Sequence, residues 1–286
     1  MNFAPVSKID THLHLVVSPL PKFSSYLDML PHLDELGIEK GIVLSAGEKH
    51  MPLGSNETAK SIAEAKPDRY SWMCALDPME PETVYDRLKL YKSQGAVGIG
   101  EVMINKPFDD PFLEAMFQAA GDLDLPVTFH MSPEEGFSYG VVDHPGLPLL
   151  EQALQRFPKT RFVGHSGAFW AEMSADAPVD RDGRNGYPGG PVVPGGRVPE
   201  LFEKYPNLYG DLSATSGGNA ILRDEAFGLA FLEQFQDRLF FATDMVNTGM
   251  VFPLGSWLDE MAKQGKLSEI AYRKICRENA ARIYGV

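Results

Sequence analysis

Eight short apolar segments alternate with segments of helical periodicity along this chain of 286 residues, and this alternation constrains the fold most strongly. The expected strands lie at residues 8–15, 40–45, 69–76, 96–102, 126–131, 160–166, 208–213 and 238–244. The expected helices lie at residues 24–37, 55–66, 81–95, 111–124, 147–158, 197–206, 225–236, 256–266 and 268–285. Strict strand–helix alternation is typical of a parallel sheet, and eight units are the number that closes a barrel.

We therefore expect an α/β fold, a (β/α)8 TIM barrel, as one domain spanning residues 1–286. An open doubly wound sheet is the alternative, but it usually carries a glycine-rich phosphate-binding turn after its first strand. Here the segment LVVSPLPKFSS occupies that place. Residues 167–196, rich in glycine and proline, follow the sixth expected strand. Long loops in compact domains are often functional, so we expect this one to lie over the active-site mouth.

Composition narrows the possible partners. The net charge of −13 and the pI near 5.0 argue against nucleic acid or an anionic membrane as partner. Cys74 and Cys276 form no CxxC motif, so neither a disulfide framework nor a thiolate metal site is expected. No basic-apolar leader and no apolar run of membrane-spanning length is present, which favours a cytoplasmic protein acting on a small molecule. The oligomeric state stays open, with a homo-oligomer as one option.

Polar residues end most of the expected strands, where a barrel carries its active site. They are His12, His14, Glu101, His130, His165, Asp211 and Asp244. Alone, each has a structural explanation: a histidine can be hydrogen-bonded, Glu101 can form a salt bridge, and Asp244 can cap a helix. Together they favour a divalent ion, because imidazole and carboxylate groups are ligands of zinc. Such an ion would make hydroxide available from water near neutral pH.

Four short motifs, THLH, FHMS, GHSG and ATD, occur in this order at the ends of strands one, five, six and eight. Together they resemble the amidohydrolase superfamily of metal-dependent hydrolases. The segments YPNLYGDLSA, LFFATD and NAARIYG are similar to its amidohydrolase-related branch, which includes aminocarboxymuconate-semialdehyde decarboxylase. The resemblance extends from Asp10 to the end of the chain and implies a TIM barrel.

The resemblance also implies roles for residues. His12, His14, His130 and Asp244 would be metal ligands, and Asp244 would also take a proton from the attacking water. His165 would orient water or polarise the substrate. The metal would be zinc, with manganese as substitute, at one or two ions per chain. Asp211 is expected to hydrogen-bond a ligand histidine, as partners of metal ligands commonly do.

Strand four departs from many two-metal relatives, which carry a carboxylated lysine there; the nearest lysine, Lys106, lies beyond its end. Instead VGIGEV resembles the strand of TatD-like and phosphotriesterase-like relatives, whose glutamate bridges two metals. If Glu101 bridges, it is a metal ligand and His165 binds the second ion. If not, Glu101 supports a ligand or contacts the substrate.

The substrate is inferred from the loops. Arg181, Arg184 and Arg197 lie in or beside the 167–196 segment, and Arg223 follows strand seven. Of these, Arg184, Arg197 and Arg223 are the candidate substrate contacts, because arginine binds carboxylates bidentately. Solvated loop charges are the alternative. Trp170 and Tyr187 are candidate pocket walls, although loop aromatics often serve packing.

Three functions remain for comparison. The first is a hydrolase that uses metal-activated water on a small carboxylated lactone, cyclic amide or ester. The second is a lyase of the same branch, a decarboxylase or hydratase acting on a carboxylated ring or dienoate. Glu101 favours hydrolysis. The third, a non-catalytic barrel, is disfavoured because every expected ligand position is filled.

Overall fold

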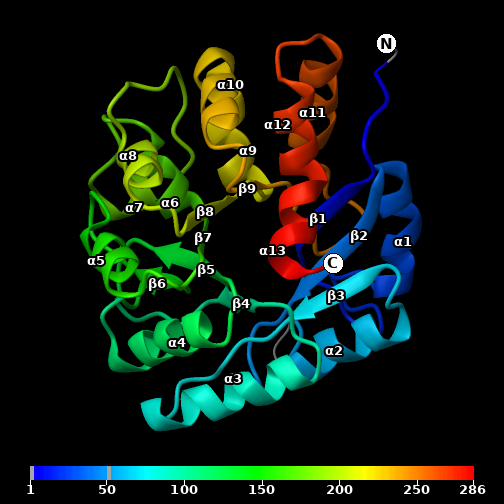
Figure 1. Ribbon diagram of the computed structural model, residues 1–286, viewed down its shortest axis with the longest axis vertical. Coiled ribbons are helices and arrows are strands. Elements are labelled where there is room, and N and C mark those ends of the chain that lie inside the picture. The colour runs from blue at the N-terminus through cyan, green and yellow to red at the C-terminus, as the bar shows by residue number, and fades with distance from the viewer. Residues whose placement is uncertain (1–2, 50–52) are drawn as a thin grey trace.

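Eight parallel strands lie at the centre of the molecule and are surrounded by helices (Figure 1). The structure, a computed structural model, describes residues 3–49 and 53–286. The strands are β1 (Lys8–Leu13), β2 (Ile38–Leu44), β3 (Tyr70–Met73), β4 (Ile99–Val102), β5 (Val127–Ser132), β7 (Phe162–His165), β8 (Leu208–Asp211) and β9 (Leu239–Phe240). They pair in the orders β1-β2-β3 and β4-β5-β7-β8-β9, all in parallel.

Short backbone bridges join these two sets into a ring. Cys74, just after β3, pairs with Ile99 of β4, and Leu13 of β1 pairs with Met245 after β9. At the second junction the backbone N–H of Asp244 donates to the carbonyl of His12 at 2.8 Å. The chain is therefore the (β/α)8 barrel that the alternation of segments predicts, and each of the eight expected strands is present.

The expected helices are also present, with slightly different ends. They are α1 (Tyr26–Glu35), α2 (Asn56–Ala65), α3 (Val84–Ser93), α4 (Pro111–Asp122), α5 (Pro148–Arg156), α8 (Arg197–Lys204), α10 (Glu225–Gln234), α11 (Leu254–Lys263), α12 (Glu269–Arg273) and α13 (Asn279–Tyr284). Side chains of Ser25, Ser55 and Asp110 accept backbone N–H groups at the first turns of α1, α2 and α4, which satisfies donors that the helices leave free. None of the helices in the described ranges is long and apolar enough to cross a membrane.

Some elements differ from the sequence-based expectation. The 167–196 segment contains three short helical pieces, α6 (Gly167–Trp170), η2 (Ala171–Met173) and α7 (Arg181–Arg184). A further helix, α9 (Ala214–Leu222), occupies a stretch expected to be loop, and a two-residue strand, β6 (Val141–Val142), pairs with β5 outside the ring. A 3-10 turn, η1 (Pro81–Thr83), precedes α3, and a π-helical turn, η3 (Lys274–Glu278), joins α12 to α13.

An apolar layer fills the inside of the ring, so inward-facing polar side chains lie beyond it, at the carboxyl ends of the strands. Ile42, Val163 and Phe240 pack together there, and Tyr284 of α13 packs against Phe240 with ring centroids 5.4 Å apart. Each inward-facing position recurs two residues along a strand. Val163 is therefore followed inside the barrel by His165, one layer closer to the carboxyl end of β7.

Candidate active site

Six side chains form a histidine–carboxylate cluster at the carboxyl ends of the strands. Its members are His12 of β1, His14 just after it, Glu101 of β4, His130 of β5, His165 of β7 and Asp244 after β9. Five of the six are buried or nearly so, and the side chain of Asp244 keeps 27% of its surface exposed. The structure thus brings together every residue that the sequence predicts as a metal ligand, and His165 with them.

Glu101 lies between two pairs of histidines. Its Oε2 atom is 3.2 Å from His14 Nε2 and 3.8 Å from His12 Nε2. Its Oε1 atom is 2.7 Å from His130 Nδ1 and 3.6 Å from His165 Nε2. The two oxygens of one carboxylate therefore face two different groups of imidazole nitrogens.

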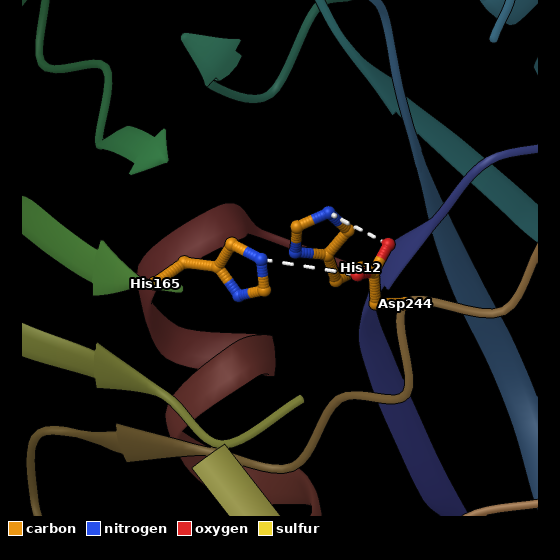
Figure 2. Close-up of side chains that lie close together, drawn as sticks. All are labelled: His12, His165 and Asp244. Carbon is orange, nitrogen blue, oxygen red and sulfur yellow. Dashed lines mark ion pairs between the residues drawn. The ribbon is translucent and has the colours of Figure 1, made fainter. Parts of the chain in front are cut away.

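Asp244, which follows β9, completes the cluster. Its Oδ1 atom is 3.5 Å from the Nε2 atoms of both His12 and His14, and its Oδ2 atom is 3.8 Å from His165 Nε2. Figure 2 shows His12 and His165 both pointing toward this carboxylate. Asp244 caps no helix, since the next one, α11, begins at Leu254, so the structural explanation considered for this residue does not apply.

Strand β8 and the residues after it hold two of the imidazoles in place. Asp211 Oδ2 is 2.6 Å from His12 Nδ1, which confirms the expected contact of Asp211 with a cluster histidine. Because an ionised carboxylate only accepts, Nδ1 of His12 carries a proton, and Nε2 is the ring nitrogen directed at the cluster, which would bind a metal after it loses its own proton. Ser213 Oγ makes the corresponding contact with His165 Nδ1 at 2.9 Å.

Electrostatic interactions in the cluster favour a cation. Burial alone would raise the pKa of Glu101, but hydrogen bonds from His12, His130 and His14 outweigh it and hold that pKa well below its ordinary value. For His12, burial disfavours the charged form, yet the carboxylates of Asp211 and Asp244 raise its pKa well above the ordinary value. Burial, together with the neighbouring His12, lowers the pKa of His165. Buried carboxylates here stay ionised and attract positive charge.

The donor atoms fit a divalent metal. His12 Nε2 and His14 Nε2 are only 3.1 Å apart, and no hydrogen-bond partner among the described residues reaches His14 Nδ1. Three sets of ligand atoms lie within 4.8 Å of one another: His12, His14 and Glu101; His12, His165 and Asp244; and Glu101, His130 and His165. Two ligands of one zinc ion, each about 2.0–2.3 Å from it, are separated by less than this distance. Nitrogen and oxygen donors without thiolate suit zinc or manganese.

A cavity of about 530 Å³ opens beside the cluster. Glu101 and Tyr139 line it on the cluster side, and the ring of Tyr139 lies against His130 with centroids 4.3 Å apart. Burial raises the pKa of Tyr139 to about 12, so its hydroxyl keeps its proton at neutral pH. The segments after β2, β3 and β4 supply the remaining walls.

The arginines predicted to contact substrate lie elsewhere. Arg184 is buried and donates to the carbonyls of Pro133 and Asp143 at 3.1 and 2.8 Å. Arg197 pairs with Glu151 and Glu200 on the outer helices. None of the three predicted arginines is among the residues that line the cavity.

Arg223 and the two predicted aromatics surround a second, narrow recess. Arg223 donates to the carbonyl of Pro188 at 3.3 Å. Trp170 is buried and donates from Nε1 to the carbonyl of Asp211 at 2.9 Å, so it supports the end of β8. Tyr187 is 55% exposed at the edge of this recess. A role of Arg184, Arg197, Arg223, Trp170 or Tyr187 in substrate binding stays a prediction.

Two residues of the site were not singled out by sequence reasoning. Ser213 and Tyr139 are polar residues in loops, and nothing in the sequence distinguishes them from their neighbours. Asp10 lies on the same strand as His12, and the pairing register of β1 shifts between Asp10 and Leu13. Its carboxylate accepts from the backbone N–H of His12 and from Thr243, both at the barrel junction. Burial raises the pKa of Asp10 to about 7, although these hydrogen bonds oppose the shift.

Comparison with known proteins agrees with this geometry. The sequence model of the amidohydrolase family matches residues 9–286. No curated protein has a sequence that matches the chain.

Solved structures similar to this one cover nearly the whole chain at low sequence identity. A 2,6-dihydroxybenzoate decarboxylase from Rhizobium has a TM-score of 0.59 and 18% identity, with 98% of this chain and 99% of that one covered. A probable 2-pyrone-4,6-dicarboxylic acid hydrolase from Acinetobacter baumannii, with citric acid bound, has a TM-score of 0.59, 14% identity and coverages of 98% and 100%. A 5-carboxyvanillate decarboxylase from Novosphingobium aromaticivorans, complexed with manganese and a nitrobenzoic acid, has a TM-score of 0.63, 14% identity and coverages of 98% and 96%.

Proposed function

The chain belongs to the amidohydrolase family, and from that membership we propose that it is a metal-dependent hydrolase of a small lactone, cyclic amide or ester. This family of metal-dependent enzymes contains both hydrolases and decarboxylases, so membership alone does not select the reaction. The reaction depends on the residues of the site.

The position of Glu101 between two histidine pairs carries the proposal. One carboxylate oxygen faces His12 and His14, and the other faces His130 and His165. This arrangement supports the bridging alternative for Glu101, in which His165 binds the second of two ions. These residues would hold one or two divalent ions, and a bound ion would supply a Lewis acid for a carbonyl and hydroxide at neutral pH, which is the chemistry of hydrolysis.

The chain's own residues supply orientation and proton transfer. Asp211 and Ser213 hold His12 and His165 with a ring nitrogen of each directed into the cluster. Asp244 is the most exposed member of the cluster. Its Oδ1 atom lies near His12 and His14, and its Oδ2 atom lies near His165. In the proposed reaction Asp244 accepts a proton from the attacking water and returns it to the leaving group.

Decarboxylation of an aromatic acid is the second candidate. Two of the similar structures are described as decarboxylases, one of them with manganese bound. In that reaction the cluster would hold the substrate, and one of its groups would protonate the ring carbon.

A single set of assays separates these two candidates. The protein is stripped with a chelator, reloaded with zinc or manganese, and incubated with lactones, cyclic amides, esters and hydroxylated benzoates. We expect metal-dependent ring opening or ester cleavage, detected by proton release. Metal-dependent carbon dioxide release from a benzoate without any hydrolysis would replace the hydrolase proposal with the lyase.

A further inference from the structure

We infer that the substrate carries an uncharged, apolar group next to its reacting carbonyl, and that this group binds in the 530 Å³ cavity beside Glu101. The inference rests on the proposed function for the position of the carbonyl, but cavity binding itself can be measured without turnover. It departs from the carboxylated substrate that the loop arginines suggested in the sequence.

The walls of the cavity are mostly apolar side chains. They include Ala46, Leu53, Leu76, Met103, Ile104 and the ring of Tyr139. A volume of this size falls in the range of small-molecule sites, about 300–1,000 Å³, and accommodates a ring system or a short alkyl chain. Apolar walls favour an apolar ligand. A polar ligand group would lose its hydrogen bonds to water and form none with these walls.

The charges at the cavity disfavour an anion. Among the described lining residues the charged side chains are Asp77, Glu101 and Lys106. Lys106 is half exposed and already pairs with Glu135 at 2.5 Å. A carboxylate placed against this wall would face Asp77, and no arginine among the described residues lines the cavity to receive it.

Two dyes of nearly identical shape test the inference on the metal-loaded protein. 1-Anilinonaphthalene is neutral, and 8-anilinonaphthalene-1-sulfonate adds one negative charge to the same rings. We expect the neutral dye to bind one site per chain at least about tenfold more tightly, since an unpaired buried charge costs more than 1.4 kcal/mol. Equal or tighter binding of the sulfonate by fluorescence titration would overturn the inference.

Substitution of Met103, which lines the cavity, tests whether the dyes bind there. Met103→Arg introduces a guanidinium into the wall and should reverse the preference by weakening the binding of the neutral dye and strengthening that of the sulfonate. Met103→Leu keeps the wall apolar and should change neither affinity by more than about twofold, since volume-conserving swaps are tolerated. If both dyes bind Met103→Arg as they bind the parent protein, the dyes occupy another site and the inference fails. Should Met103→Arg not fold, the comparison of the two dyes on the parent protein still decides.

A kinetic comparison separates this inference from the proposed function. Dihydrocoumarin is a neutral aromatic lactone, and its ring-carboxylated derivative adds one carboxylate group to the same ring system. Selective binding of the neutral dye, with no hydrolysis of these lactones or of the cyclic amides and esters tested, would leave binding in the cavity standing and remove the proposed function. Faster hydrolysis of the carboxylated lactone would support the proposed function and overturn the inference.

Discussion

Asp244 has a backbone conformation that few residues share, with φ at 59° in the left-handed region. Asparagine and aspartate enter this region more readily than other residues with side chains, because their short polar groups bond locally. Asp244→Asn should therefore keep the fold and one coordinating oxygen while losing the basic carboxylate. This substitution isolates the chemical role of Asp244 from its structural one.

We expect Asp244→Asn to lower turnover by about 10²–10⁴-fold, the usual contribution of general acid–base catalysis, with a much smaller change in KM. Turnover, metal content and unfolding by urea should be measured on one preparation. Asp244→Ala serves as the comparison, since it adds the backbone cost of about 1–2 kcal/mol for alanine in this region. A stable Asp244→Asn protein with full metal and near-normal turnover would exclude Asp244 as the base.

Among the elements, the short strand β8 contributes to the site through the side chain of its last residue, Asp211, which contacts His12. In Asp211→Asn an amide nitrogen can donate to His12 Nδ1, which moves the ring proton to Nε2 and removes the lone pair that faces the cluster. Metal affinity should fall about 10–100-fold, as it does when partners of ligand histidines are lost. Competition with a zinc-binding dye measures it, and Asp237→Asn, at an exposed position, is the matched control. Unchanged affinity in Asp211→Asn would show that β8 does not orient His12.

Helices α5 and α8 are joined by ion pairs that include Arg197, one of the residues predicted to contact the substrate. Glu151 interacts with Lys204, Tyr205 and Arg197, and these contacts, in this order of strength, lower the pKa of Glu151 to about 2. A depressed folded-state pKa adds stability that is present above the ordinary value of 4.5 and is lost as the pH falls toward 2.

Glu151→Gln should therefore lower the free energy of unfolding by about 1 kcal/mol or less near pH 7, since solvent screens these pairs. The difference from the parent protein should shrink as urea unfolding is repeated at falling pH down to about 3. A difference that stays constant with pH would mean that packing of the Glu151 side chain, and not its charge, matters. Turnover at neutral pH should not change, because Arg197 is placed outside the cavity.

For the whole molecule, the cluster joins strands from around the barrel, so metal binding should stabilise the complete fold. A ligand that binds only the folded state contributes about 2.7 kcal/mol at 100 times its Kd. For a domain of this size we expect metal removal to lower Tm by about 5–10 °C. Elemental analysis should find close to two ions per chain, and Glu101→Gln should lose at least one. A chelated protein that melts at the same temperature as the loaded one would contradict a metal centre that spans these strands.

The barrel could be predicted because each segment shows by itself whether its apolar residues have the spacing of a strand or of a helix. Helix α9 could not, because its serine and glycine content disfavours a helix in isolation. The structure explains that content: a Cβ atom at Gly217 would lie 2.4 Å from the backbone of Leu212, so glycine permits the close packing. The cluster was predictable from residues at strand ends. The partner of Arg197 was not, because Glu151 lies 46 positions away on another helix.

The hydrogen bonds that complete the site have a consequence for biosynthesis. The contact between His12 and Asp211 spans 199 positions of the chain, and the contact between Asp10 and Thr243 spans 233. Contacts that close such long loops form late, after the local ones. His12 and His14 therefore leave the ribosome long before their partners are made, and we expect a metal to be acquired only by a chain that has already folded. A ribosome-bound chain that stops before β8 should bind zinc no better than the same chain with His12 and His14 replaced by alanine.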